Sequence, residues 1–403
     1  MNPSIATLHP ATSATTAAPT TDLDIAICGA GPAGMALAAL LVKRGMAPQR
    51  IGLIDAKTLA QASNDPRSLA LSYGSRQILE QTGAWPVIGT PIHQIHVSRR
   101  GQFGRSLIDR EEHGVPALGY VTRYGDLVTV LGAVCERAGI RTLRPARVTG
   151  SVEHEDRIDL HILHEGEQDA RTLSAAIMVQ AEGGLFSDQE SKSVRRDYEQ
   201  TAIIAQVRTS APIAHRAYER FTEQGPLALL PQDSRDGQAE YSLVWCARPD
   251  QAQALLALDD ATFLAQLGAA FGDRLGKFVA ATPRLGFPLG LNADARSTAR
   301  SVAIGNAAQT MHPVAGQGLN LGLRDVAVLA HLLAPAATPD NLARYTAQRH
   351  ADRSTTMRLT DTMARIFAND TPAQALLGIS LAAIDLFRPA RSVLAELMMY
   401  GRR

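Results

Sequence analysis

The hydrophobic pattern of the first half of the chain alternates between short apolar runs and longer helical stretches. Leu23 to Cys28 and Ile51 to Ile54 have the length of buried parallel strands, and the Ala/Leu-rich stretch Met35 to Val42 predicts a helix between them. The strand pattern returns at Ala175 to Ala181 and at Ser301 to Ile304. Because alternating strands and helices are typical of a parallel sheet, the chain predicts an α/β fold with a Rossmann-like nucleotide-binding domain.

The pattern changes between residues 190 and 290. Thr201 to Val207, Ala228 to Leu230 and Tyr241 to Cys246 predict short strands without helices between them. Phe263 to Phe271 has the periodicity of an amphipathic helix. We therefore expect an antiparallel β-sheet that forms a separate substrate domain.

These patterns divide the chain into five parts. Residues 1–20 are rich in Ala, Thr, Pro and Ser, contain no Lys or Arg, and are expected to form a disordered tail. The other parts follow in order: the nucleotide-binding domain, first part, at 21–189 with an excursion into the substrate domain near 92–118; the substrate domain at 190–290; the second part of the nucleotide-binding domain at 291–345; and a C-terminal helical region at 346–403.

A glycine motif lies between the first strand and the first helix. Gly29, Gly31 and Gly34 form G-x-G-x-x-G, in which the first glycine permits a tight turn, the second lets the backbone approach a pyrophosphate and the third lets the helix pack on the strand. Asp55 ends the second strand, 21 residues beyond Gly34, where a ribose-binding carboxylate is expected. The free N–H groups at the helix N-terminus would face the phosphates. The motif therefore predicts a dinucleotide site.

A second glycine-rich passage covers residues 305–320. It follows the strand Ser301 to Ile304 and opens a helix with a buried stripe. The stripe consists of Leu323, Val326, Leu329, Leu332 and Leu333. Its spacing differs from that of the first motif, so we expect it to direct a helix N-terminus at another, anionic part of one large cofactor.

Several polar residues keep two interpretations. Asp65 to Ser72 is expected to lead into a helix that contains Ile78 and Leu79, and Arg67 could either reach the pyrophosphate or cap the start of that helix at the surface. Ile92 to Val97 is expected to form a strand, on which His93 and His96 point to opposite faces and do not share a metal.

Composition narrows the class of protein. The chain has 403 residues, which allows two or three domains, and a net charge of +1, which gives no support for nucleic-acid binding. The three cysteines are scattered, so we expect neither a disulfide framework nor a metal cluster. This use of cysteine is typical of a reducing compartment, and we expect a cytoplasmic protein. The sequence has no apolar run long enough to span a membrane.

The motifs together resemble those of single-component FAD-dependent aromatic hydroxylases. The residues that carry the resemblance are G-A-G-P-A-G at 29–34, the acid at 55, the acid–glycine pair at 182–183, F-P-L at 287–289 and G-N-A-A-Q…H-P-V-A-G-Q-G-L-N at 305–320. More narrowly, the chain is similar to the ubiquinone-biosynthesis hydroxylases, and its middle segments look most like members that act on 2-octaprenyl-6-methoxyphenol. The resemblance runs from about residue 22 nearly to the C-terminus.

The resemblance implies FAD as cofactor and assigns residues to it. Gly29, Gly31 and Gly34 would hold the pyrophosphate, Asp55 the adenosine ribose, and Arg67 would lie beside the cofactor. The remaining cofactor-binding positions that it implies are Glu182, Gly183, Asn306, Pro313, Gly316, Gln317, Gly318 and Asn320. Asn306 and Glu182 stand where most relatives have Asp, which puts FAD affinity and the nicotinamide donor in question. His312 could move a proton, although a loop residue hydrogen-bonded to backbone is the favoured interpretation.

The implied activity is hydroxylation of a polyprenylated phenol, with 2-polyprenyl-6-methoxyphenol as the first candidate, through a C4a-hydroperoxyflavin. It would use O₂ and NAD(P)H or another electron donor, and proteins of a ubiquinone-biosynthesis complex would be partners. Alternatives are a flavin hydroxylase for another ring position or another aromatic substrate, and a non-catalytic scaffold of that complex. A dehydrogenase is disfavoured because it has no use for residues 305–320.

The apolar residues 376–387 and 393–399 are expected either to pack on the cofactor domain or to dock peripherally at the inner membrane or on a partner.

Overall fold

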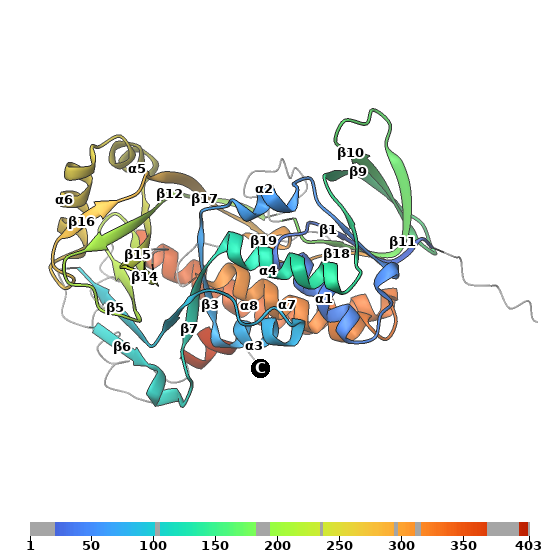
Figure 1. The fold of residues 1–403 in the computed structure, drawn as a ribbon, viewed down its shortest axis with the longest axis horizontal. Helices are drawn as coiled ribbons and strands as arrows, with labels where there is room; N and C mark the ends of the chain where they lie inside the picture. The colour runs from blue at the N-terminus through green and yellow to red at the C-terminus, as the bar shows by residue number, and fades with distance from the viewer. Residues whose placement is uncertain are drawn as a thin grey trace, which may run out of the picture.

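The computed structural model describes residues 21–100, 105–182, 194–233, 237–293, 297–310, 316–368 and 395–401. Two lobes lie end to end along the long axis of the molecule (Figure 1). One lobe combines a largely parallel sheet with most of the helices, and the other is built on an antiparallel sheet. The α/β fold with a second, antiparallel domain is therefore confirmed.

The first lobe is built on a seven-stranded sheet. Its order is β8-β2-β1-β11-β10-β9, with β18 beside β11, and β1 pairs in parallel with both β2 and β11. The strands are β1 (Leu23–Cys28), β2 (Ile51–Ile54), β8 (Arg141–Leu143), β9 (Ala146–Glu153), β10 (Ile158–His164), β11 (Arg171–Gln180) and β18 (Ser301–Ala303). The first two strands begin and end where the apolar runs predict, and β18 returns to the sheet as predicted.

Helices pack beside this sheet and beside one another (Figure 1). They are α1 (Pro32–Lys43), α2 (Leu59–Ser63), α3 (Tyr73–Thr82), α4 (Tyr124–Arg137), α7 (Gln317–Leu333) and α8 (Pro339–Ala368). Helix α1 is buried along almost all of its length, which explains its Ala/Leu-rich sequence with no charged residue before Lys43. All five apolar residues of the predicted stripe on α7 are buried, so that prediction is confirmed. Burial of this stripe joins α7 to the core around α1.

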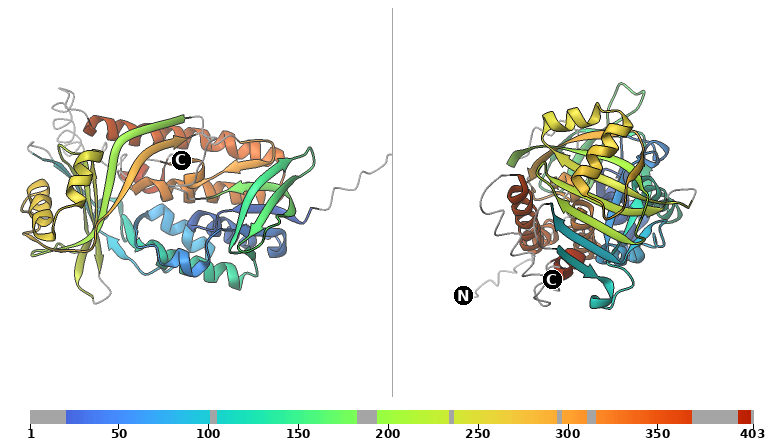
Figure 2. Two further views of the ribbon diagram at one scale, coloured as in Figure 1. Left: turned by 90° about the horizontal axis from the view of Figure 1, so that it is seen from above. Right: turned by 90° about the vertical axis from the view of Figure 1, so that its left-hand side faces the viewer.

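The second lobe contains a nine-stranded sheet in the order β19-β17-β12-β15-β14-β13-β5-β6, with β16 beside β12. Its strands are β5 (Gln94–Arg99), β6 (Arg105–Asp109), β12 (Val194–Thr209), β13 (Arg216–Phe221), β14 (Pro226–Asp233), β15 (Ala239–Ala247), β16 (Phe278–Ala281), β17 (Leu285–Ala293) and β19 (Gln309–Thr310). Helices α5 (Pro249–Leu256) and α6 (Asp260–Phe271) cover its outer face (Figure 2). Trp245, Phe263 and Phe271 fill the space between them.

A small sheet at the junction contains one strand that the sequence did not predict and interrupts one that it did. It consists of β3 (Ser68–Ser72), β7 (Gly119–Arg123) and β4 (Thr90–Ile92), all antiparallel. Residues 68–72 form a strand before α3 because β7 supplies a partner about fifty residues later in the chain. The helix expected to contain Ile78 and Leu79 is α3, as predicted. His93 separates β4 from β5, so the strand expected at 92–97 is broken at that residue.

In the described part of the chain, two long elements cross the expected domain limits, and three short 3₁₀ helices lie within those limits. The 3₁₀ helices are η1 (Pro48–Arg50), η2 (Arg110–His113) and η3 (Gly305–Ala307). Helix α8 runs through the limit at 345/346, and β17 runs through the limit at 290/291. Strand β17 of the antiparallel sheet pairs with β19, which directly follows η3 in the second glycine-rich passage. The two lobes are therefore joined by continuous secondary structure.

Candidate functional site

The turn between β1 and α1 requires glycine at two positions for packing. Gly29 has φ of 108°, and a Cβ there would lie 2.5 Å from the backbone of Ala181 and of Glu182. A Cβ on Gly34 would overlap the carbonyl oxygen of Gly29, only 1.9 Å away. These glycines hold the start of α1 against β1 and the end of β11, as the motif predicts.

Gly31 differs from its two neighbours in the motif. It has φ of −76°, so its backbone does not itself demand glycine, and it is half-buried at the N-cap of α1. A Cβ there would meet the Tyr124 hydroxyl at 3.2 Å. Helix α1 has no side-chain cap and no acidic residue in its first turn. Its first N–H groups are therefore available to an anion, which the positive end of the helix dipole also attracts.

Asp55 lies beside this turn, as the spacing predicts. Its Oδ2 accepts a hydrogen bond from the backbone N–H of Ala30 at 2.7 Å, and its Oδ1 accepts one from the backbone N–H of Lys57 at 2.8 Å. Arg144 lies 3.5 Å from Oδ2 and also donates to the Ala30 carbonyl. The carboxylate is thus fixed at the end of β2.

Sequence reasoning missed Arg144. It follows β8, the strand that pairs with the end of β2, and the backbone N–H of Asp55 donates to the carbonyl of Leu143. The available signal was an arginine directly after a short strand and before Pro145, but its partner strand could not be read from the sequence. Arg144 adds a positive charge to the edge where the glycine turn and Asp55 meet.

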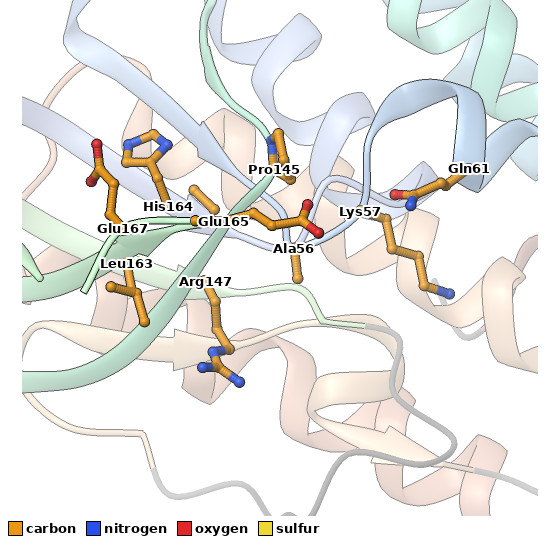
Figure 3. A pocket seen from close by; sticks show the side chains of 11 residues that line it. Ala56, Lys57, Gln61, Pro145, Arg147, Leu163, His164, Glu165 and Glu167 are labelled. Atoms are coloured by element: carbon orange, nitrogen blue, oxygen red, sulfur yellow. The ribbon is translucent and has the colours of Figure 1, made fainter. Parts of the chain in front are cut away.

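A cavity of about 570 Å³ opens next to Asp55, at the end of β2 (Figure 3). Lys57 and Gln61 lie on one side of it, and His164 at the end of β10 and Glu167 from the β10–β11 turn lie on the other. Arg147 of β9 also lines it. A volume of this size is within the usual range for small-ligand sites, so the cavity could accommodate the nucleoside end of a dinucleotide.

Arg67 and Gly31 both lie beside Tyr124. The Arg67 guanidinium donates to both carboxylate oxygens of Asp65, the closest contact being 2.6 Å, and it lies 5.1 Å from the ring centre of Tyr124. Burial opposes the charge of Arg67, but its hydrogen bonds with Asp65 and the charge of that carboxylate hold its pKa above the ordinary value. Arg67 precedes β3 rather than a helix, so the helix-start interpretation is wrong.

The second glycine passage meets the first one in space. Gly305 has φ of 58°, and a Cβ there would lie 3.6 Å from the Cβ of Ala33 in α1. A Cβ on Gly322 of α7 would lie 3.0 Å from the Cα of Gly305. The start of α1, η3 and the start of α7 therefore converge, although residues 33 and 305 are far apart in sequence.

Asn306 and Gly318 are neighbours at the start of α7. A Cβ on Gly318 would lie 3.6 Å from Oδ1 of Asn306. Gly316 caps the helix with φ of 59°, and α7 has neither a side-chain cap nor an acidic residue in its first turn. This second bare helix N-terminus can stabilise negative charge in the same way as α1.

Asn320 and Gln317 bond within the protein. Asn320 is buried, donates to the carbonyls of Ala70 and Gly316, and accepts from the Ser72 N–H and the Ser75 hydroxyl, all within 2.7–2.9 Å. These contacts use its two donors and two acceptor positions. Gln317 donates to the carbonyl of Met398 at 3.4 Å. In this structure both side chains hold the start of α7 in place.

A buried charge network under η3 was also missed. Asp325 of α7 is fully buried and lies 2.7 Å from Arg349 and 2.9 Å from Arg353, both of α8. Arg353 also donates to the Ala303 carbonyl at 3.1 Å, and the Gly305 N–H lies 3.5 Å from Asp325. The network therefore ties the turn around Asn306 to α8. Its signal in the sequence was a charged residue inside a buried apolar stripe.

The other predicted site residues are placed only in part. Glu182 follows β11, its backbone N faces Gly29, and burial, followed by the charge of Asp55, raises its pKa. Gly183, His312 and Pro313 lie outside the described residues. Within the described ranges, His, Cys, Asp and Glu form no group that could hold a metal ion, and no helix there is long and apolar enough to cross a membrane.

Comparisons with known proteins agree with this geometry. The sequence matches the FAD binding domain family over residues 22–360. It is 33% identical over 385 residues to the ubiquinone hydroxylase UbiL of Rhodospirillum rubrum, covering 91% of this chain and 87% of that protein. It is 29% identical to the 3-demethoxyubiquinol 3-hydroxylase of Escherichia coli, covering 87% and 91%. The fold is similar to that of p-nitrophenol 4-monooxygenase PnpA from Pseudomonas putida DLL-E4, with a TM-score of 0.74, 15% identity, and 94% and 99% of the two chains covered.

Proposed function

The chain belongs to the FAD binding domain family and is an FAD-dependent monooxygenase, and from this premise we propose that it hydroxylates a polyprenylated phenol in ubiquinone biosynthesis. The first candidate substrate is 2-polyprenyl-6-methoxyphenol. The observation that carries the proposal is the convergence of the two glycine passages, with Gly305 beside Ala33, in a chain similar to ubiquinone hydroxylases over nearly its whole length. One convergent site of this kind suits one large flavin dinucleotide.

The residues of this chain fit FAD. The bare N-terminus of α1 at Gly31 would take the pyrophosphate, because among the described residues only the Tyr124 hydroxyl lies within 4 Å of a Cβ placed on that glycine. The cavity beside Asp55 would take the adenosine end. Asn306, beside Gly318, would face the ribityl chain, and the start of α7 would face the isoalloxazine ring.

FAD, when bound, supplies the redox chemistry with O₂. The chain must bind the cofactor, orient the phenol and keep water out. The uncapped start of α7 would stabilise negative charge on the ring edge that it faces. Electrons would come from NAD(P)H or from another donor.

The ring position is tested by product analysis. The purified, FAD-loaded protein is assayed with prenylated phenols that differ only in ring substitution, and quinone intermediates are measured in a strain that lacks the gene. We expect 2-polyprenyl-6-methoxyphenol to be hydroxylated and to accumulate in the deletion strain. A different accumulated compound would overturn the ring assignment and would identify the correct substrate, such as 3-demethoxyubiquinol, which the name of the Escherichia coli relative gives as its substrate.

The same strain distinguishes an enzyme from a scaffold of the biosynthetic complex. Complementation is compared for the wild-type protein and a Gly31→Val variant, in which a side chain occupies the phosphate position. We expect the variant to fail. Complementation by a folded, flavin-free variant would show that the protein acts without catalysis.

A further inference from the structure

One face of the antiparallel sheet carries an excess of arginine. In β5, β13 and β6, register places Gln94, His96 and Ser98 beside Arg216, Tyr218 and Arg220 on one side and beside Asp109, Leu107 and Arg105 on the other. Arg274, from the loop after α6, joins this face through His96, and Arg100 adds its charge near Arg220. In the described part of the chain, the three strands contribute a single carboxylate to this face, Asp109. We call this surface the arginine face.

Arg220 is the half-buried centre of the arginine face. Its guanidinium lies 5.8 Å from the ring centre of Phe271, and its Nη1 lies 3.5 Å from the hydroxyl of buried Ser98. Its Nε is buried and has no hydrogen-bond partner among the described residues. Burial, followed by the charges of Arg274 and Arg100, lowers the pKa of Arg220. A bound anion would therefore stabilise the charged form of this guanidinium.

Arg274 is exposed and donates to Nε2 of His96 at 2.9 Å. Because that nitrogen accepts, His96 is neutral and adds no positive charge of its own. Within the described ranges, neither Arg220 nor Arg274 forms an ion pair with a carboxylate, although Asp273 precedes Arg274 directly in the sequence. The C-terminus of α6 lies close to Arg220, but a helix end offers only about half a negative charge.

We propose that Arg220 and Arg274 bind a phosphate group at the arginine face. Guanidinium groups present planar pairs of N–H donors that match phosphate oxygens, and two of them balance a phosphate charge. Ser98 supplies a neutral hydroxyl beside Arg220. The phosphate belongs either to a small soluble molecule or to a phospholipid headgroup.

This site is separate from the proposed cofactor site. It lies in the antiparallel lobe with β5 and α6, at the far end of the molecule from the β9–β10 hairpin and the cavity beside Asp55 (Figure 1). The proposal therefore does not rest on the proposed hydroxylase function. Phosphate binding and FAD binding can be measured independently in one preparation.

The test uses the full-length, FAD-loaded protein with two probes. Inorganic phosphate is titrated while thermal unfolding is followed, against sodium chloride at equal ionic strength. Phosphatidylcholine vesicles with and without phosphatidylglycerol are used for co-sedimentation. The variants are Arg220→Gln and Arg274→Gln, and the control is Arg344→Gln, an exposed arginine of α8 that makes the same change of charge in the other lobe.

We expect the wild-type protein to bind at least one probe and both variants to weaken its binding about tenfold, because each removes a charge-assisted hydrogen bond, while Arg344→Gln leaves binding unchanged. Protection by inorganic phosphate identifies a soluble ligand, and binding to the phosphatidylglycerol vesicles alone identifies a headgroup. Absence of binding to both probes would overturn the proposal, as would an equal loss in Arg344→Gln. Because Arg274 is exposed, its variant tests the site even if Arg220→Gln does not fold.

Discussion

Gly31 combines bare main chain at a helix N-terminus with little room for a side chain. A valine Cβ at this position would lie 3.2 Å from the Tyr124 hydroxyl, and the side chain would block the proposed phosphate position. We expect Gly31→Val to fold and to lose bound FAD, measured as flavin absorbance per protein chain with circular dichroism as a check of folding. Gly150→Val is the control, because among the described residues its Cβ would meet only His161, at an ordinary 3.6 Å. Full flavin content in Gly31→Val would rule out the proposed pyrophosphate position.

His96 is buried and should make stability depend on pH. Burial, followed by the charge of Arg274, lowers its pKa from 6.5 to about 4. The unfolded chain therefore binds more protons than the folded one between these values, and the free energy of unfolding falls as the pH drops from about 6.5 to about 4, by about 3 kcal/mol for this group.

The measurement is denaturant unfolding over that pH range in phosphate-free buffer. In His96→Gln the fall in stability should be smaller than in the wild-type protein, because the titrating group is gone. His350→Gln, which removes an exposed histidine of α8, is the control. If the wild type and His96→Gln show parallel pH profiles, His96 is not held neutral by its surroundings.

Helices α7 and α8 depend on the charge network around Asp325. Asp325→Asn leaves Arg349 and Arg353 without the fully buried carboxylate that both contact. Loss of one partner from a buried pair typically costs about 3–5 kcal/mol, and we expect a loss of unfolding free energy of that order. Because Arg353 also holds the Ala303 carbonyl under η3, FAD retention should fall as well.

Denaturant unfolding and flavin content of the same preparation check this prediction. Asp260→Asn is the control, because its carboxylate is largely exposed in the ion pair with Arg284 and its loss should cost less than about 1 kcal/mol. A change in Asp325→Asn no larger than in this control would show that the network is dispensable. Unchanged flavin content in a destabilised variant would separate stability of the helices from the position of η3.

The substrate proposed for the two lobes, a polyprenylated phenol, barely dissolves in water. We predict that the protein collects its polyprenylated phenol through peripheral association, mainly with proteins of the biosynthetic complex, and that Leu376 and Leu377 belong to the docking surface. Both lie outside the described residues. Each leucine buried on docking would contribute about 1.5–3 kcal/mol.

Replacing Leu376 and Leu377 together by Glu should therefore reduce hydroxylation in cells while FAD content stays intact. The control replaces Ile88 and Val279, which are exposed apolar residues of the described surface, by Glu. Substrate conversion in cells and flavin absorbance of the purified variants are the readouts. If the leucine variant unfolds, these residues belong to an ordinary core and the docking prediction is wrong.

Local features of the chain could be predicted because the residues that cause them are neighbours in sequence. The apolar runs determined the limits of β1 and β2, and the turn chemistry of the first motif identified the packing reasons for Gly29 and Gly34. Helical periodicity identified the buried face of α7. The spacing from Gly34 to Asp55 was also enough to predict that Asp55 lies beside the glycine turn, because β1 and β2 pair in parallel and end at the same sheet edge.

Contacts between distant segments were decided only by the tertiary structure. Residues 68–72 form a strand because β7 pairs with them, and local preference alone did not contain that partner. Arg144 reaches the first turn, 114 residues away, through the pairing of β8 with β2. Asp325 acquires its role from α8, and Arg220 lies beside Ser98 across 122 residues. Hydrogen bonds and ion pairs of this kind require both partners to be held within a few ångströms, and that proximity exists only after the sheets and helices have packed.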